Sequence, residues 1–278
     1  MTVKFTTAEN VALERIHAAM LDAFSDYDLP LQPDFEQFER MLRSRHFDAK
    51  LSSLAVENEK VLSFWIIGKR GNNGHLAMSG TRVHSRGNGL AKLLSANSEA
   101  AMRDAGVANF QFEVLTTNER AIRLYEKLGH APKREFDVFR FAAPTTPNDN
   151  NLEISLVNWN DIVADAQSFK DVQPSWQADD AAIEALGNDV IVWGAKAKST
   201  LLGYLATAPN GSILQLAVSP SYRRKGVATA LLSQFSRTNQ VEQFTYVNID
   251  SNDLNTQQFM RALSADLIAR QLEMHKSL

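Results

Sequence analysis

The chain has 278 residues, of which 44% are hydrophobic and 22% are charged, and its net charge is −3 at pH 7. At about 150 residues per domain, this length favours two globular domains. The slightly acidic charge gives no broad electrostatic reason to bind nucleic acid or a membrane surface. Because the sequence contains no cysteine, it excludes disulfide scaffolds, thiolate zinc sites, iron-sulfur clusters and cysteine nucleophiles. No apolar stretch approaches the roughly 18 residues of a membrane helix, so we expect a cytoplasmic protein.

The first half of the chain opens with a short strand and an amphipathic helix. Thr6 and Glu9 have the spacing of a capping box. One apolar face follows, formed by Leu13, Ile16, Met20 and Phe24. His17 lies on the same stripe, and we interpret it as a core or edge histidine. The other elements predicted in this half are strands at residues 3–5, 54–57, 61–68, 76–83 and 110–115 and a helix at residues 35–45.

The second half repeats the same order of elements. Its predicted elements are strands at residues 152–156, 190–195, 201–206, 213–218, 244–250 and 271–274 and a helix at residues 180–186. Matching positions are about 134 to 140 residues apart, which indicates an internal repeat. Between the halves, residues 142–151 read AAPTTPNDNN and lose all hydrophobic periodicity. We therefore predict a linker there, between one domain at residues 1–141 and another at residues 152–278.

The pattern R-x-x-G-x-A occurs once in each half. The two copies are Arg86-Gly87-Asn88-Gly89-Leu90-Ala91 and Arg223-Arg224-Lys225-Gly226-Val227-Ala228. Each copy joins a predicted strand to a predicted helix, where backbone N–H groups and the positive end of the helix dipole suit a phosphate or pyrophosphate. Neither copy ends in the Gly-Lys-Ser/Thr of a Walker loop, and Lys92 stands where a dinucleotide fingerprint needs its third glycine.

A second motif follows the first loop. Residues 117–129 read TNERAIRLYEKLG and resemble the segment N-x-x-A-x-x-x-Y-E-K-x-G-F of the GCN5-related N-acetyltransferases. His130 stands in place of the usual aromatic residue. The two loops also resemble this family's signature, Q/R-x-x-G-x-G/A. The resemblance covers nearly the whole chain, with one domain of this fold in each half.

The resemblance implies an α/β fold with two tandem domains, each a mixed, mostly antiparallel sheet flanked by helices. It also implies acetyl-coenzyme A (acetyl-CoA) as cofactor and no metal. The loops would bind the pyrophosphate, and the pantetheine arm would lie between two splayed parallel strands. The implied coenzyme-binding residues are Thr81, Val83, Arg86, Gly87, Asn88, Gly89, Leu90, Ala91, Lys92 and Asn118 in the first half and Ala217, Val218, Arg223, Arg224, Lys225, Gly226, Val227, Ala228, Thr229, Asn252 and Phe259 in the second.

Tyr125 is implied by the resemblance to be the general acid that protonates the departing thiolate. Asn118 precedes it by seven residues on one helix face, after a possible capping box of Thr116 and Glu119. The second half has Phe259 at the equivalent place, and a phenyl ring has no proton to give. We therefore expect the chemistry in the first half, with turnover about 100- to 10,000-fold lower in Tyr125→Phe.

The general base and the acceptor are less well defined by the sequence. Glu113 is a candidate base, although its side chain could equally face solvent, and a water relay or a neutral amine would need no base. His84 is expected to be a surface or loop residue. Residues 27–33 and 173–177, the latter with Trp176, either shape an acceptor pocket or are ordinary loop positions.

Three functions agree with these patterns to different degrees. The leading interpretation is an N-acetyltransferase that uses acetyl-CoA and an amine of a small molecule or peptide. A catalytically silent protein that binds or senses coenzyme A (CoA) is the alternative, which Phe259 supports. Aminoacyl transfer from tRNA is a third, against which the acidic net charge argues. The sequence identifies neither the acceptor nor the oligomeric state.

Overall fold

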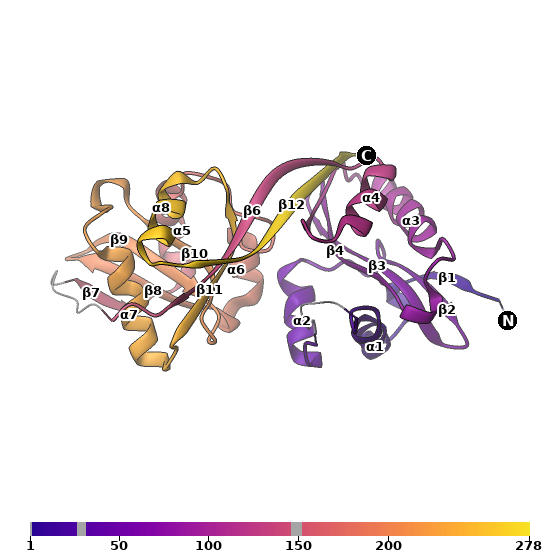
Figure 1. Cartoon of the computed structure of the whole chain (residues 1–278), viewed down its shortest axis with the longest axis horizontal. Coiled ribbons are helices and arrows are strands. Elements are labelled where there is room, and N and C mark those ends of the chain that lie inside the picture. Colours follow the sequence, from indigo (N-terminus) through magenta and orange to yellow (C-terminus); the bar gives the residue numbers. More distant parts are fainter. Residues whose placement is uncertain (1, 27–31, 146–151) are drawn as a thin grey trace. The chain divides into compact units, whose positions relative to one another are not determined.

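The computed structural model describes residues 2–26, 32–145 and 152–278. The chain is an α/β protein that divides into two compact units (Figure 1). Unit 1 comprises Met1–Val114, Asn118–Lys133 and Glu273–Leu278, and unit 2 comprises Leu115–Thr117 and Arg134–Leu272. Residues 146–151 of the predicted linker lie outside the described residues, and the boundaries of the domains stay a prediction.

Unit 1 is built on a sheet of strand order β1-β2-β3-β4-β5. Its elements are β1 (Lys4–Thr7), α1 (Leu13–Ala23), α2 (Phe35–Ser44), β2 (Ser53–Glu57), β3 (Lys60–Arg70), β4 (Asn73–Thr81), α3 (Leu90–Asp104), β5 (Asn109–Leu115) and α4 (Glu119–Lys127). Adjacent strands are antiparallel except β4 and β5, which are parallel. In Figure 1, α1 and α2 lie on one side of β3 and β4, and α3 and α4 lie on the other.

Unit 2 repeats this plan with strand order β6-β11-β10-β9-β8-β7. Its elements are β6 (Ala131–Ala142), β7 (Glu153–Leu156), α5 (Trp159–Phe169), α6 (Asp180–Leu186), β8 (Ile191–Ala197), β9 (Thr200–Thr207), β10 (Ser212–Val218), α7 (Val227–Asn239), β11 (Gln243–Asp250), α8 (Leu254–Ala262) and β12 (Asp266–Ser277). Here β10 and β11 are the parallel pair. The repeated order confirms the predicted α/β fold with two tandem domains.

Two strands are shared between the halves of the sequence. Although β6 belongs to the first half, it pairs with β11 in unit 2, where Phe141 lies opposite Phe244. In return, Glu273–Leu278 belong to unit 1, where the Leu278 N–H donates to the carbonyl of Ala108 (3.0 Å). The sequence did not predict β6 and predicted only residues 271–274 of β12.

Two predicted helix caps are wrong. The helix predicted to begin near Thr6 begins at Leu13, because residues 8–10 form a 3₁₀ turn and the Thr6 hydroxyl oxygen accepts from the Asn10 side chain (3.2 Å). The cap of α4 is Asn118, whose side-chain oxygen accepts from the Ala121 N–H (3.2 Å). Thr116 instead donates its hydroxyl to a backbone carbonyl elsewhere in unit 2.

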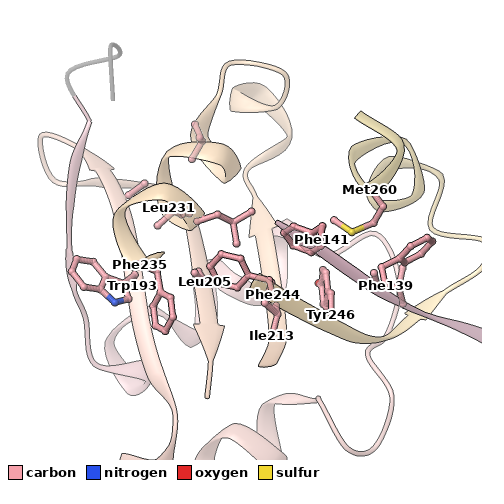
Figure 2. Packing of buried hydrophobic residues seen from close by; sticks show 14 of the residues in the cluster. Phe139, Phe141, Trp193, Leu205, Ile213, Leu231, Phe235, Phe244, Tyr246 and Met260 are labelled. Atoms are coloured by element: carbon pink, nitrogen blue, oxygen red, sulfur yellow. The ribbon is translucent and has the colours of Figure 1, made fainter. Parts of the chain in front are cut away.

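The core of unit 2 lies on both faces of its sheet. Successive side chains of a strand point to opposite faces. Accordingly, Trp193 of β8 joins the cluster that contains the apolar side of α7, whereas Val192 joins the cluster that contains α5. In the first cluster, Phe235 of α7 packs against Phe244 of β11, with ring centroids 5.8 Å apart (Figure 2). The helices before and after the parallel strands therefore cover different faces.

A β-bulge occurs at the same place in both units. Leu214 is an extra residue in the pairing of β10 with β9, and Ala77 is the extra residue in the pairing of β4 with β3. The interval between these two positions along the chain equals the interval between Gly89 and Gly226 of the two loops. A bulge bends its strand away from regular pairing. The parallel pairs β4–β5 and β10–β11 accordingly end just before it.

Lys276 provides a test of how strongly the end of β12 is held in unit 1. Its ammonium group donates to both carboxylate oxygens of Glu99 (2.7 Å each), and the Glu99 side chain is only 8% exposed. Lys276→Met should therefore lower the free energy of unfolding by about 1 to 3 kcal/mol, measured by urea denaturation. In a Glu99→Gln background the same change should cost much less. Equal losses in both backgrounds would show that this ion pair contributes no stability.

Candidate functional site

A cleft of about 360 Å³ opens between β10 and β11 in unit 2. The two strands pair at Ser212 with Thr245 and at Ile213 with Tyr246, and then they separate. The cleft is lined by the ends of both strands, the segment after α5, the second glycine loop with the start of α7, and α8. All of these lining residues belong to unit 2.

The loop before α7 has a backbone that few residue types adopt easily. Gly226 caps the helix with a φ of 79°, and Arg224 has a φ of 60°, both in the left-handed region. This path presents the first turn of α7 to the cleft. Because the first N–H groups of a helix have no partner within it, those of Val227, Ala228 and Thr229 can donate to an anion there. The first loop has the same form, with positive φ at Gly87 and Gly89.

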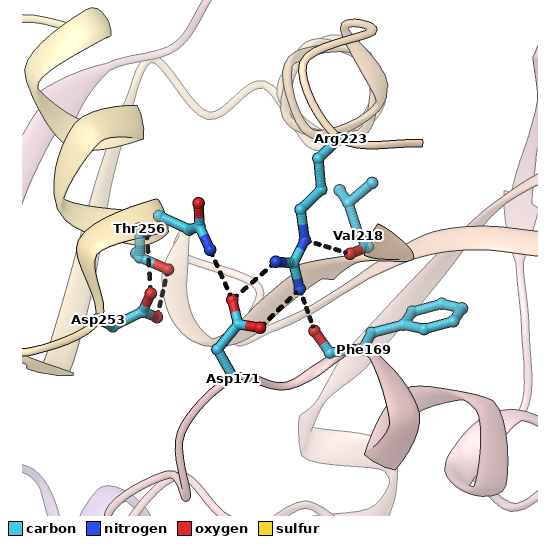
Figure 3. A network of polar contacts seen from close by, with 7 residues as sticks. Phe169, Asp171, Val218, Arg223, Asp253 and Thr256 are labelled. Atoms are coloured by element: carbon cyan, nitrogen blue, oxygen red, sulfur yellow. Dashed lines mark hydrogen bonds and ion pairs between the residues drawn. The ribbon is translucent and has the colours of Figure 1, made fainter. Parts of the chain in front are cut away.

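Arg223, the first arginine of the second R-x-x-G-x-A loop, binds other groups of the protein. The Arg223 guanidinium forms a two-pronged ion pair with Asp171 (2.8 and 3.1 Å). It also donates to the carbonyls of Val218 (3.1 Å) and Phe169 (2.9 Å), as Figure 3 shows. Asn255 of α8 donates to the same carboxylate (2.8 Å). Arg223 therefore ties the loop to the end of β10 and the end of α5, and Asp171 links this pair to the start of α8.

Arg86 makes the equivalent contacts in unit 1. It pairs with both carboxylate oxygens of Asp26 (2.5 and 2.8 Å) and donates to the carbonyls of Ala23 and Thr81. The hydrogen bond from Arg86 lowers the pKa of Asp26. Both arginine side chains therefore form their contacts within their own unit.

Cationic side chains stand at the mouth of the cleft. Arg224 lines it and donates to Gln258 of α8 (3.4 Å), while the Lys225 ammonium donates to the Ser221 carbonyl (2.9 Å) and lies 5.0 Å from the ring centroid of Tyr222. Lys225 is not among the lining residues. Arg224 therefore places a positive charge beside the helix N-terminus, which suits a bound anion.

A buried hydrogen-bond network fixes one wall of the cleft. The Tyr204 hydroxyl donates to the Gln215 side-chain oxygen (2.7 Å), and the Gln215 amide donates to the Ala178 carbonyl (2.7 Å) and to Asp180 (3.1 Å). Burial raises the pKa of Tyr204, so that its phenol stays neutral and keeps donating. The hydroxyl of Tyr204 is therefore committed to the protein.

Two cleft residues were missed in the sequence. Asp171, the partner of Arg223, had a signal, because an aspartate follows the equivalent helix in the first half at Asp26. Tyr246 had no such signal, because a tyrosine on a predicted strand has the pattern of a core residue. Its hydroxyl nevertheless accepts from the Leu216 N–H (3.1 Å) across the opening between β10 and β11.

In unit 1 the Tyr125 side chain contacts residues of β3, β4 and β5. The Tyr125 ring packs against Phe112, with centroids 4.3 Å apart, and against Trp65 at 6.0 Å. Its hydroxyl is 3.1 Å from the Ser79 hydroxyl on β4. Tyr125 is 8% exposed, so it faces the interior of unit 1.

The predicted equivalence of Phe259 with Tyr125 is wrong by one position. The His130 N–H donates to the Tyr125 carbonyl after α4, and the Ala265 N–H donates to the Met260 carbonyl after α8. The matching hydrogen bonds therefore pair Tyr125 with Met260. The shift arises because β11 contains one extra residue after Tyr246, where its register with β6 changes. Phe259 nevertheless lines the cleft.

Glu113 is also in the interior of unit 1. Its carboxylate lies 2.9 Å from the His75 ring nitrogen, and both side chains are almost completely buried. Burial lowers the pKa of His75 although Glu113 opposes that change. The position equivalent to Glu113 in unit 2 is Val247, which carries no ionisable group.

The remaining predicted site residues fall into two groups. Ala217, Val218, Gly226, Val227, Ala228, Thr229 and Phe259 line the cleft with Arg223 and Arg224. Asn252 and the first-half residues Thr81, Val83, Gly87, Asn88, Gly89, Leu90, Ala91, Lys92 and Asn118 do not line it. Of the predicted acceptor loops, Gln173 and Pro174 line the cleft, Trp176 is buried elsewhere, and residues 27–31 lie outside the described residues.

Neither of the two histidines singled out in the sequence, His17 and His84, belongs to the cleft. His17 contacts the rings of Phe35 and Phe38 and donates to the Pro33 carbonyl (2.8 Å), in agreement with a role in packing. His84 is an exposed residue of the turn before Arg86. Over the described ranges, no group of three or more His, Asp or Glu side chains could hold a metal ion. Within those same ranges, no helix has the length and apolar character needed to cross a bilayer.

Comparison with known proteins agrees with this geometry. The Acetyltransferase (GNAT) family profile matches residues 13–130 and again residues 157–263, so the chain belongs to this family and contains two such domains. A search of curated proteins finds no match.

Solved structures share the fold at low sequence identity. A GCN5-related N-acetyltransferase from Sphaerobacter thermophilus is 15% identical with a TM-score of 0.73, over 99% of this chain and 95% of that one. A tandem GNAT protein from the clavulanic acid biosynthesis pathway is 12% identical with a TM-score of 0.73, over 99% and 98%. A GCN5-related N-acetyltransferase from Kribbella flavida is 14% identical with a TM-score of 0.62, over 99% and 72%.

His130 predicts a pH dependence of stability in unit 1. It is 3% exposed between the rings of Phe110 and Phe112, and burial, with a smaller effect of Lys276, lowers its pKa from 6.5 to about 4. Below pH 6.5 the unfolded chain therefore binds a proton that the folded chain does not. The stability from His130 is complete above pH 6.5 and is lost as the pH falls towards 4.

Urea unfolding at several pH values between 7 and 4 tests this expectation. His130→Phe should flatten the decline in the free energy of unfolding over that range, because the buried ring no longer takes up a proton on unfolding. His84→Gln is the matched control at an exposed histidine and should keep the wild-type decline. An unchanged pH dependence in His130→Phe would contradict the assignment.

Proposed function

We propose that the chain transfers an acetyl group from acetyl-CoA to an amine of a small molecule or peptide, with the coenzyme in the cleft of unit 2. The observation that carries the proposal is the meeting of two features in one cavity. The first turn of α7 offers main-chain donors at one end, and the separated edges of β10 and β11 form the passage that leads away from it.

The residues at the mouth of the cleft fit a pyrophosphate. Gly226 allows an anion to approach the backbone closely, and the N–H groups of Val227, Ala228 and Thr229 follow it on the helix. The Arg224 side chain adds a positive charge at the same place. Because Arg223 is already paired with Asp171, its contribution is to hold the loop.

The passage between the strands fits the amide-containing pantetheine arm. Backbone groups of Ala217 and Val218 border it on β10, and Phe259 and Ala262 of α8 give it an apolar wall. Separated strand edges offer hydrogen bonds to an extended ligand in the way that a neighbouring strand would. When bound, acetyl-CoA supplies a thioester whose carbonyl carbon is open to attack by an amine.

The acceptor would approach from the segment after α5. Gln173 and Pro174 line this part of the cleft, beside the ends of β10 and β11. A small-molecule or peptide amine is therefore the substrate class that we propose. Coenzyme binding by the first loop and a catalytic role of Tyr125 or Glu113 stay predictions, and in unit 1 the Tyr125 and Phe112 rings pack against each other.

Two matched glycine variants test where the coenzyme binds. Gly226 and Gly89 are both helix N-caps with a positive φ. Valine strains the backbone at either position to a similar degree. We expect Gly226→Val to abolish CoA binding measured by calorimetry and Gly89→Val to retain it. Loss of binding in Gly89→Val alone would move the site to unit 1.

Release of free thiol from acetyl-CoA tests the transferase activity. The chain has no cysteine, so a thiol reagent reports only the coenzyme. Across a panel of amines, amino acids and short peptides, we expect release above the background with at least one acceptor. Tight CoA binding without any acceptor-dependent release would favour the catalytically silent CoA-binding alternative.

A further inference from the structure

Each unit has a tyrosine beside its pair of parallel strands. The tyrosine of unit 1 is on a helix, and that of unit 2 is on a strand. His75 and Ser212 each stand two positions before the bulge of their strand, so they are equivalent. His75 pairs with Gln111 on β5, and Ser212 pairs with Thr245 on β11. The next residues on these strands are Phe112 and Tyr246, which are therefore equivalent. The strand position thus carries a phenyl ring in unit 1 and a phenol in unit 2.

The following helix shows the opposite arrangement. Asn118 caps α4 by accepting from the Ala121 N–H (3.2 Å), and Asp253 caps α8 by accepting from the Thr256 N–H (3.1 Å). Counted from these matching caps, Tyr125 on α4 again corresponds to Met260 on α8. Met260 is completely buried and has no proton to give. In unit 2 the helix therefore supplies no hydroxyl at this position.

The hydroxyl groups of the two tyrosines reach equivalent places. In unit 1 the Tyr125 hydroxyl contacts Ser79 on β4 at 3.1 Å. In unit 2 the Tyr246 hydroxyl contacts the backbone N–H of Leu216 on β10 at 3.1 Å. Ser79 and Leu216 each follow the bulge of their strand by two positions, so they are equivalent. One unit thus supplies the hydroxyl from the helix, and the other supplies it from the strand.

The Tyr246 hydroxyl remains able to donate to a ligand. It accepts from the Leu216 N–H and donates to the Leu216 carbonyl, but that donated bond is long (3.5 Å), so a better acceptor in the cleft can replace it. Burial raises the pKa of Tyr246, so its phenol keeps its proton at neutral pH. The ring packs within the buried cluster shown in Figure 2, which fixes its direction.

The other tyrosines of the cleft are less suitable. Three tyrosines line it, Tyr204, Tyr222 and Tyr246. Tyr204 is completely buried, and its hydroxyl already donates to Gln215. Tyr222 lies on the rim, 36% exposed beside Lys225. Tyr246 is the one whose hydroxyl lies across the opening between the strands.

We propose that Tyr246 donates a hydrogen bond to the coenzyme sulfur in unit 2 and stabilises the thiolate that leaves, a role that rests on the function proposed above. In that reaction the amine lone pair forms the C–N bond to the thioester carbonyl carbon. The C–S bond breaks, and its electron pair stays on sulfur. The proton lost by the amine goes to water, so the products are the N-acetylated amine, the CoA thiolate and one proton.

The thiol pKa of bound CoA tests this assignment without any acceptor. A hydrogen bond to the thiolate should lower that pKa by about 1 to 2 units in the wild-type complex relative to the Tyr246→Phe complex. The thiolate absorbance reports it directly, because the protein contains no thiol of its own. Ser233→Ala, which removes a buried hydroxyl of α7 that bonds the Pro144 carbonyl and does not line the cleft, is the control and should keep the wild-type value.

Desulfo-coenzyme A separates the contact with sulfur from a general loss of structure. Its affinity, measured by calorimetry, should be the same for the wild type and for Tyr246→Phe, because this ligand has no sulfur to accept the bond. With acetyl-CoA and an active amine, Tyr246→Phe should lower kcat about 100-fold and leave KM for acetyl-CoA nearly unchanged. Loss of desulfo-coenzyme A binding would instead show that Tyr246 has only a structural role.

The outcomes distinguish this inference from the proposed function. If the thiol pKa of bound CoA is the same in the wild type and in Tyr246→Phe, the proposed role of Tyr246 is wrong. The proposed transferase function is not affected by that result. A wild-type protein that binds no coenzyme at all overturns the function and, with it, the role of Tyr246.

Discussion

The site in unit 2 depends on a parallel pair of strands that cannot stay paired. Leu214 is an extra residue in β10, and the register of β11 with β6 shifts after Tyr246, where Asn248 has a φ of 54°. With a bulge on each strand, β10 and β11 separate and expose main-chain groups that regular pairing would have used. The cleft, its lining by two strand edges and the position of the glycine loop at its mouth all follow from this separation.

Unit 1 shows that the same backbone plan can support a different interior. The bulge in β4, the left-handed glycines and the Arg86–Asp26 ion pair repeat features of unit 2. The space between β4 and β5 nevertheless holds packed rings and a buried histidine–carboxylate pair. The two units therefore differ at this place both in their side chains and in the extra residue of β11.

The sequence predicted the repeat well because its signals are local. Strand alternation, amphipathic helices and the two R-x-x-G-x-A loops each depend on residues close together in the chain. The two predicted caps were wrong, since the hydroxyls of Thr6 and Thr116 have other hydrogen-bond partners. Both failures arose from competition between hydrogen-bond partners, which sequence spacing does not resolve.

Features that depend on distant residues could not be predicted in this way. The burial of Glu113 depends on His75, which precedes it on another strand. The role of β6 depends on a partner strand in the second half of the chain, and no periodicity identifies that partner. The extra residue in β11 also left no local signal, so Phe259 was matched to Tyr125. Tyr246 was overlooked because a tyrosine in an alternating strand has the same pattern whether it packs in a core or borders a cleft.

The exchange of strands makes both units depend on the last strand to be synthesised. Unit 1 uses residues 273–278, which the ribosome makes only after every residue of unit 2. Until they emerge, β5 has an open edge beside it, and an open edge invites pairing with other chains. Unit 2 waits almost as long, because it includes the residues of the same strand up to Leu272. Neither unit can therefore complete its set of strands before β12 is made, so one late strand couples the completion of both domains.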